Sequence, residues 1–336
     1  MSVITRNLMM AAGQGSGPAD HVFVVFTDKI IAFNVTDPAN PTITSSLTYD
    51  GFIYLKSDIV YSAKTKHVFA TSWVPDIGIV AIDVSDPSAM SVSSEYVMTE
   101  PPTGLALDDA HGRLYSIDEG SVVRKLNVTN PSSISQATAN TLSYSFYDHG
   151  NGDICLDLIN RRVFVSQYST RDPETYANPY LYTYYLLNDS LTELDDYEYS
   201  RPTAIDSYQL NYLNPKTKTA YATANILSSY AFDYSGDTLG GPSEAGADYT
   251  SSLSQLYFRS RDDYNFGVQS RPNFIAHDDY RLISFRAASG TFYCVSTAYP
   301  DSPVTLGSVD YSAITTETYG SAIANVSGPA ATYGYR

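Results

Sequence analysis

Basic residues, cysteine, tryptophan and long apolar runs are all scarce in this chain. Lys and Arg number 20 and Asp and Glu 36 among 336 residues, so the formal net charge is −16 at pH 7. Proteins that neutralise nucleic-acid phosphates need clustered Lys and Arg, and we therefore expect no nucleic-acid partner. No window approaches the roughly 18 consecutive apolar residues of a membrane-spanning helix, so we also expect no membrane insertion.

The two cysteines are too few for a disulfide framework. Cys155 and Cys294 each lie inside an apolar run, which favours buried thiols, while a single bridge stays open for a protein that works outside a cell. We expect no export signal, because residues 8–12 are the longest apolar stretch near the N-terminus and a signal peptide needs about 7–15 apolar residues. Residues 13–18 are typical of a flexible linker.

What the chain has in excess is tyrosine, with 30 copies beside 13 Phe and one Trp. Apolar residues make up 43%, enough to bury the surface that a folded protein needs, which excludes general disorder. Between residues 20 and 320, short runs of β-branched and aromatic residues alternate with clusters of Gly, Pro, Asn, Asp and Ser. This pattern predicts an all-β fold with many short strands.

Two sequence units recur along these strands. In the first, an apolar strand ends in Val-Ser/Thr-Asp/Asn-Pro and a strand rich in Ser and Thr follows, at 30–50, 79–97 and 122–138. We expect the side chains of Asp37, Asp86 and Asn130 to close turns, with the following Pro fixing φ. The second unit is a strand, a polar turn and another strand, at 104–118, 154–168, 204–224 and 274–288.

Joining the two units gives a four-stranded antiparallel repeat of about 40–50 residues, the size of a propeller blade. The length after the linker favours seven blades, and six remain compatible because 250–270 supplies only part of one. The run 311–326 is expected to supply the innermost strand of the first blade and to close the ring. We therefore predict an anchor peptide and linker at 1–18, an all-β β-propeller at 19–326 and a tail at 327–336.

Two resemblances accompany these patterns. The Val-Ser/Thr-Asp-Pro units resemble the LVIVD-type repeats of bacterial and archaeal surface β-propellers, which implies the fold and no particular function. The segment Ile4-Thr5-Arg6-Asn7-Leu8-Met9-Met10-Ala11-Ala12-Gly13 resembles a leader of tailed-bacteriophage structural proteins, where it precedes unrelated β-rich domains. That resemblance implies that the segment docks the chain on a virion, with contacts from Arg6, Asn7, Leu8, Met9 and Met10.

Catalytic signatures are weak. The chain has no G-x-S-x-G elbow, H-E-x-x-H helix or P-loop. Its 36 acids are too many for one glycosidase pair to be singled out. We therefore predict no enzymatic activity and no cofactor, apart from a candidate calcium site. The oxygen ligands that calcium prefers occur on a Gly-rich turn at Asp148, Asn151 and Asp153, where an ordinary turn is the alternative.

The densest tyrosine cluster lies at 176–199. Strand alternation places Tyr180, Tyr182 and Tyr184 on one face and Tyr185 on the other. Tyrosine suits recognition of sugars or proteins because it offers a large contact area with a hydroxyl group, but it also fills the wedge between blades. The binding candidates are Tyr176, Tyr180, Tyr182, Tyr184, Tyr197 and Tyr199.

Together these observations favour a non-enzymatic structural protein of a phage virion, as a tail-tip, fibre or capsid-decorating component. It would be assembled in the host cytoplasm in multiple copies per particle. Residues 1–18 would bind other virion proteins, and the propeller would bind a host-surface glycan or protein. The alternatives are an extracellular adhesion or binding propeller on a prokaryotic cell surface, and a propeller glycoside hydrolase.

Overall fold

A computed structural model describes sixteen stretches of the chain. They are residues 21–26, 28–49, 52, 58–72, 77–143, 151–170, 180–201, 211–214, 219–225, 228–236, 238–239, 243–244, 283–288, 290–296, 304–315 and 322–325. Within them the chain forms antiparallel sheets, five with four strands and one with three, so the predicted all-β class and four-stranded repeat are confirmed. Over the same stretches, no helix has the length and apolar content to cross a membrane.

The sheets are numbered 1 to 6 in chain order, and sheet 1 combines strands from both ends of the chain. Sheet 1 has the order β23 (Ala322–Asn325), β1 (His21–Val25), β2 (Lys29–Asn34) and β3 (Thr42–Thr48). Sheet 2 consists of β4 (Ile59–Ser62), β5 (His67–Thr71), β6 (Ile79–Asp83) and β7 (Ser91–Tyr96). Sheet 3 consists of β8 (Pro102–Asp108), β9 (Arg113–Asp118), β10 (Val122–Asn127) and β11 (Ser135–Thr141).

Sheets 4 to 6 follow in chain order. Sheet 4 consists of β12 (Asn151–Asp157), β13 (Arg162–Thr170), β14 (Tyr180–Asn188) and β15 (Glu193–Arg201). Sheet 5 consists of β16 (Asn211–Asn214), β17 (Thr219–Asn225), β18 (Ser228–Asp233) and β19 (Ser243–Glu244). Sheet 6 has β20 (Ile283–Ala288), β21 (Thr291–Ser296) and β22 (Val304–Asp310).

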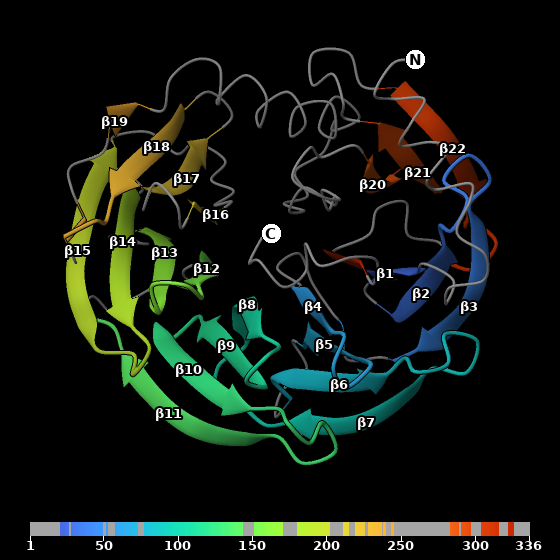
Figure 1. Ribbon diagram of the computed structural model, residues 1–336, viewed down its shortest axis with the longest axis horizontal. Helices are drawn as coiled ribbons and strands as arrows, with labels where there is room; N and C mark the ends of the chain where they lie inside the picture. The colour runs from blue at the N-terminus through green and yellow to red at the C-terminus, as the bar shows by residue number, and fades with distance from the viewer. Residues whose placement is uncertain are drawn as a thin grey trace.

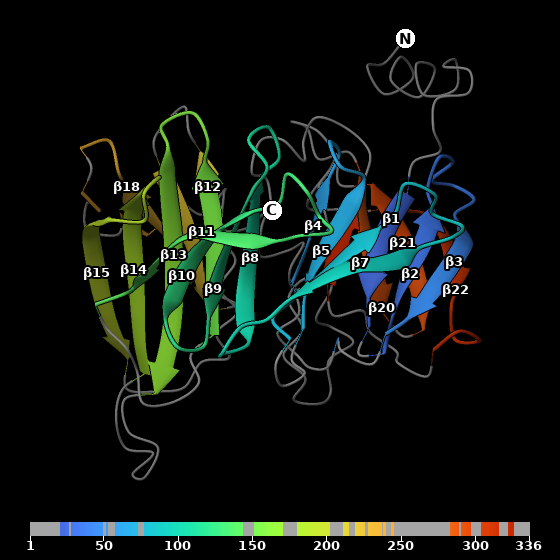
Figure 2. The ribbon, with the colours of Figure 1, turned by 90° about the horizontal axis from the view of Figure 1, so that it is seen from below.

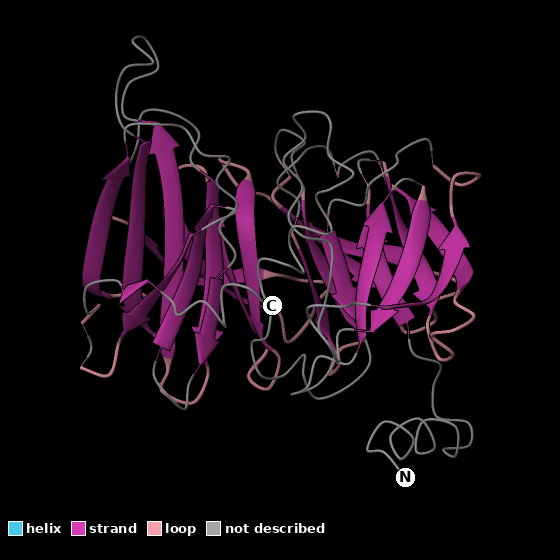
Figure 3. Cartoon of the chain, turned by 90° about the horizontal axis from the view of Figure 1, so that it is seen from above, coloured by secondary structure: helices cyan, strands magenta, loops and turns pink. Residues whose placement is uncertain are grey.

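The sheets stand around a common centre. In Figure 1 the first strand of each sheet, such as β4, β8 and β12, lies nearest the centre, and the last, such as β3, β7 and β11, lies outside. The strands run through the thickness of the molecule, so their connections gather on two opposite faces (Figure 2). Figure 3 shows the same arrangement of strands and loops from the other side.

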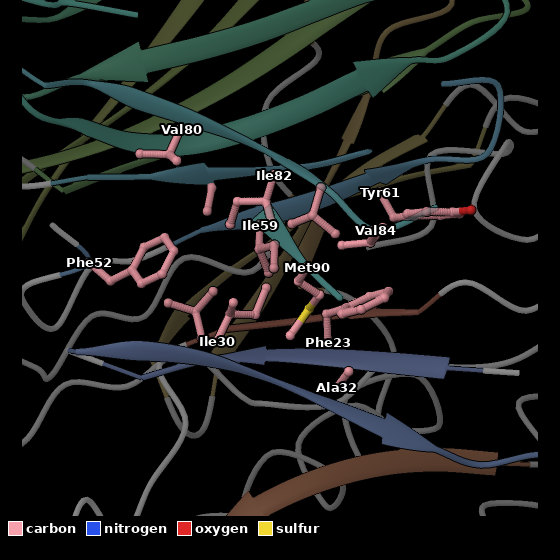
Figure 4. Packing of buried hydrophobic residues seen from close by; sticks show 13 residues of the cluster. Phe23, Ile30, Ala32, Phe52, Ile59, Tyr61, Val80, Ile82, Val84 and Met90 are labelled. Carbon is pink, nitrogen blue, oxygen red and sulfur yellow. The ribbon is translucent and has the colours of Figure 1, made fainter. Parts of the chain in front are cut away.

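The apolar core lies in the seams between neighbouring sheets. One cluster joins sheets 1 and 2 through side chains such as Phe23, Ile30, Ile59 and Val80 (Figure 4). Equivalent clusters join sheets 2 and 3, sheets 3 and 4, and sheets 1 and 6. Because a sheet between two seams is covered on both faces, β1 is buried at every position and its sequence is almost wholly apolar.

Asx turns connect the third and fourth strands of sheets 1 to 3, as predicted. The side-chain Oδ1 atoms of Asp37, Asp86 and Asn130 accept hydrogen bonds from the backbone N–H two residues later, over 3.0, 2.9 and 3.2 Å. The register between these strands shifts by one residue in each sheet, which is a β-bulge that increases the local twist.

Two of these turns also bind the outer strand of the preceding sheet. The hydroxyl of Ser45 in β3 donates to the Pro87 carbonyl over 2.5 Å, and the hydroxyl of Ser94 in β7 donates to the Pro131 carbonyl over 2.5 Å. In a related contact, the side-chain amide of Asn140 in β11 donates to the Leu191 carbonyl, in the turn between β14 and β15, which has no proline. The repeated Asp/Asn-Pro turn is therefore a docking point between sheets as well as a chain reversal.

A second repeated turn connects the inner two strands of sheets 2 to 4. Its first residue, which is Ser62, Asp108 or Asp157, accepts a backbone hydrogen bond from the third residue after it. Four positions after that cap, Lys66, Gly112 and Arg161 have φ of 58°, 61° and 57°. Only Gly112 adopts this left-handed conformation without strain from a Cβ, so Lys66 and Arg161 hold it against their intrinsic preference.

Sheet 6 packs against sheet 1. Phe292 in β21 stacks on Phe33 in β2 with ring centroids 4.1 Å apart, and Tyr311 meets Phe26 edge-on. The ammonium of Lys29 donates to the Ile314 carbonyl over 2.8 Å. β23 lies within residues 311–326, which are expected to supply the innermost strand of the first blade, and it pairs antiparallel with β1.

Candidate functional site

Of the tyrosine binding candidates, Tyr184 is the one whose side chain the structure describes. Its side chain is 1% exposed and stacks near Phe164, so the prediction that it belongs to an exposed contact surface is wrong. The physical reason is that β14 is covered on both faces, since Tyr185 on the opposite face is also buried, in the seam with sheet 3.

The other tyrosine candidates stay predictions. Tyr176 lies outside the described residues. The backbone register places Tyr182 of β14 opposite Tyr199 of β15, and Tyr184 opposite Tyr197. Tyr180 begins β14 and pairs with Arg201. Elsewhere, Tyr115, Tyr234 and Tyr311 are buried, so these tyrosines fill space between sheets.

The candidate calcium site also stays a prediction. Asp148 lies outside the described residues, and Asn151 and Asp153 share a face of β12. Asp153 is buried, and its Oδ1 accepts the Ile154 N–H over 2.9 Å. In the part of the chain that the structure describes, no group of three or more His, Cys, Asp and Glu side chains is placed to hold a metal ion.

Buried polar side chains instead fasten the inner strands to one another. Asp58, at the start of β4, is fully buried, and its Oδ2 accepts the Leu105 N–H of β8 over 2.6 Å. Thr103 Oγ1 in β8 accepts the Gly152 N–H of β12 over 3.1 Å. These contacts satisfy backbone donors that a buried strand edge would otherwise leave unpaired. Sequence reasoning missed them because the partners lie more than forty residues apart.

A buried ion pair lies within sheet 3. The carboxylate of Asp118 is fully buried, accepts the Val122 N–H over 2.8 Å and pairs with the guanidinium of Arg124. Burial raises the pKa of Asp118, while the hydrogen bonds from Arg124 and Val122 act in the opposite direction. The pair fixes the connection between β9 and β10.

A charged network ties sheet 3 to sheet 4. Asp189, in the turn after β14, accepts hydrogen bonds from the Tyr115 hydroxyl over 2.7 Å and the Arg161 guanidinium over 2.8 Å. The Lys125 ammonium lies 3.0 Å from the same carboxylate and donates to the Asp189 carbonyl. Burial alone would raise the pKa of Asp189, but these three donors outweigh it and lower the pKa to about 2.

This network predicts a pH dependence of stability. Because the folded pKa of about 2 lies below the ordinary 3.8, ionised Asp189 stabilises the fold above about pH 4, and this contribution is lost as the pH falls through 2. Asp189→Asn should lower the thermal midpoint at pH 6, and the difference from wild type should shrink towards zero near pH 2. Calorimetry between pH 6 and pH 2 measures the thermal midpoints of both proteins. A difference between the midpoints that stays constant with pH would contradict the stabilising role of ionised Asp189.

The histidines and cysteines have structural surroundings. His21 contacts Thr44, His67 contacts Ser93, and His111 contacts Asp108 over 2.7 Å. His149 and His277 lie outside the described residues. Cys155 and Cys294 are free and buried, which confirms the interpretation as buried thiols, and burial raises the pKa of both.

Comparisons with known proteins give the fold and no family. No family model and no curated protein matches the chain. A candidate 6-phosphogluconolactonase from Bacteroides fragilis matches with a TM-score of 0.55 and 10% identity, over 94% of this chain and 100% of that one. Apo AztD from Citrobacter koseri matches with a TM-score of 0.46 and 11% identity, over 92% of this chain and 99% of that one.

A WD40 domain of coronin from Toxoplasma gondii also matches, with a TM-score of 0.40 and 9% identity. That match covers 64% of this chain and 55% of the coronin chain. At 10% identity, the match to the candidate 6-phosphogluconolactonase bears on the fold alone, and the resemblance to LVIVD-type repeats stays a prediction. Within the described residues the chain is an all-β protein of antiparallel sheets, five with four strands and one with three, and its fold is propeller-like.

Proposed function

We propose that this chain is a non-enzymatic structural protein of a bacteriophage virion, in which a propeller binds a host surface and residues 1–18 bind other virion proteins. The segment 4–13, with its phage-like sequence, is the observation that carries the proposal. It lies outside the described residues and is followed by the Gly-rich linker 13–18. A short docking peptide on a flexible linker leaves the folded body free to face outward.

The buried carboxylates support a binding role over a hydrolytic one. Glycoside hydrolysis needs two carboxylates that face a substrate across the scissile bond. Asp58 and Asp153 accept backbone N–H groups, and Asp118 is held by Arg124, so these three have structural partners. A carboxylate engaged in this way contributes to rigidity, which suits a scaffold that presents a surface.

The proposal includes a closed ring. β23 pairs with β1 in sheet 1, and sheet 6 packs on the other face of the same sheet, so the two ends of the fold meet there. Six sheets occur among the described residues. The seventh blade favoured by the repeat length would come from residues 245–282, which lie between β19 and β20 in the sequence and outside the described residues.

Deleting residues 2–13 tests the anchor. The truncated chain should keep the circular dichroism and thermal midpoint of the full chain, because the sheets begin at His21. It should be absent from particles purified from cells that also make the other virion proteins. A second variant keeps the full chain length and carries Arg6→Glu with Leu8→Asp in the anchor. It should also be absent from particles, which separates loss of the anchor's side chains from the change in length. Incorporation of either variant at the full-length level would overturn the anchoring role.

A further inference from the structure

We propose that the inner turns of sheets 2, 3 and 4 form a basic collar that binds anionic, carboxylate-bearing polysaccharide. The basic collar consists of Lys64, Lys66, His111, Arg161 and Arg162. The inference rests on the proposed host-binding function and names the class of ligand for it. The site is distinct from the tyrosine cluster and comes from three turns that are far apart in the sequence.

The three turns lie against one another on one face of the molecule. Asp109, in the turn of sheet 3, accepts a hydrogen bond from the Ser62 hydroxyl and another from the Lys64 N–H over 3.1 Å. The Lys64 ammonium donates to the Ala110 carbonyl over 3.1 Å. On the other side, Arg161 of sheet 4 lies 3.8 Å from Asp108 of sheet 3. The collar is therefore one continuous surface at the inner edge of three sheets.

The charge that faces solvent there is opposite in sign to the charge of the whole chain. Within 62–66, 108–113 and 157–162, Lys and Arg number five and Asp three, and Asp189 of a neighbouring turn adds a carboxylate that pairs with Arg161 over 2.8 Å. The side chains of Arg161 and His111 are 46% and 62% exposed, and Lys64 and Lys66 are exposed. In contrast, the Asp108 side chain is 3% exposed and Asp157 is buried. Both carboxylates point into their own turns, where they accept backbone N–H groups. Because Asp189 offsets the charge of Arg161, Lys64 and Lys66 supply most of the exposed positive charge of the collar.

Acidic residues lie at the opposite end of the inner strands, at Asp58, Asp118 and Glu119. The described collar residues therefore lie at the end of these strands that is away from the acidic group.

The other groups on the collar fit a sugar better than a nucleic acid. Ile159, between Asp157 and Arg161, is 66% exposed and offers an apolar contact to the C–H face of a pyranose. Thr65 is half-buried beside Lys64 and carries a hydroxyl group. Sequence-tolerant nucleic-acid sites rely on stacking platforms of several exposed aromatic rings, and the described collar residues include no Phe, Tyr or Trp. A few cationic side chains next to uncharged groups are complementary to a polysaccharide whose carboxylates are widely spaced.

Binding of an oligogalacturonate about ten sugars long to the full-length chain tests the proposal by calorimetry. We expect binding at 50 mM salt that weakens about tenfold or more at 200 mM, because counterions are released. The fully methyl-esterified oligomer, which has the same sugars without charge, should not bind. Lys64→Gln with Lys66→Gln should weaken binding about tenfold, and Lys66→Gln alone should weaken it less.

The matched control is Ser91→Glu with Ser135→Glu, which changes the net charge equally at exposed positions on outer strands. It should bind like wild type. Equal loss in both double variants, binding of the esterified oligomer, or equally tight binding of an oligodeoxythymidylate would overturn the assignment. Lys66 makes no side-chain hydrogen bond or ion pair within the described residues, so its single variant separates charge from folding. Because isolated protein is used, the result is independent of incorporation into particles.

Discussion

Replacing Asp118 by Ala should lower the free energy of unfolding by about 3–5 kcal/mol. The Asp118 side chain is fully buried, and its partner Arg124 is 13% exposed, so the substitution leaves a guanidinium without its counter-charge in a region that water scarcely reaches. The Val122 N–H loses its acceptor at the same time. Urea denaturation with linear extrapolation measures the change.

Two further variants separate this burial effect from the loss of a hydrogen bond. Asp86 also accepts a local N–H, from Ser88 over 2.9 Å, but it lies on an exposed turn where water can replace the lost acceptor, so Asp86→Ala should lower the free energy of unfolding far less than Asp118→Ala. Asp118→Leu with Arg124→Met removes both charges and should recover most of the stability lost in Asp118→Ala. The explanation fails if Asp118→Ala costs no more than Asp86→Ala.

Gly307→Ala should weaken the contact between sheets 6 and 1 and cost about 2–3 kcal/mol. A Cβ at this position of β22 would lie 2.4 Å from the Ala39 carbonyl oxygen and 2.6 Å from that of Pro38, which are backbone atoms in the turn between β2 and β3. Neither atom has a side-chain torsion that relieves the overlap, so one sheet must move. Amide exchange in β1 and β22 should accelerate, while exchange in sheet 3 stays unchanged.

Gly236→Ala is the control for this prediction. Among the described residues, a Cβ at Gly236 meets only Thr238 Oγ1, at 3.7 Å, which is an ordinary contact. The substitution should change the free energy of unfolding by less than about 0.5 kcal/mol, as usual for an exposed site without special contacts. Equal stability of Gly307→Ala and Gly236→Ala would show that sheets 6 and 1 do not pack as closely as the structure places them.

Local structure was readable from the sequence because it depends on residues close together in the chain. Turn closure by Asp37, Asp86 and Asn130 needs one side chain and a backbone N–H two residues away, and it is confirmed in all three turns. The pairing of β23 with β1 followed from a missing strand in the repeat count. Both inferences rest on periodicity and turn chemistry alone.

The sequence did not predict which faces of each sheet the neighbouring sheets cover. Strand alternation places Tyr184 and Tyr185 on opposite faces, but it does not tell which faces neighbouring sheets cover, and both side chains are buried. The network around Asp189 joins Tyr115 to a residue 74 positions later, and no short-range pattern marks it. The basic collar was overlooked because a net charge of −16 describes the chain and not any one surface.

The contacts between the outer strands and turns of the following sheets have a consequence for folding kinetics. From sheet 1 to sheet 3, each outer strand reaches forward to a turn 37 to 51 residues later, so a sheet finds its docking point soon after it is synthesised. The contact from Lys29 to Ile314 spans 285 residues and requires almost the whole chain. Because closing a long loop is entropically costly, we expect association of sheet 6 and β23 with sheet 1 to be the slow, final folding step.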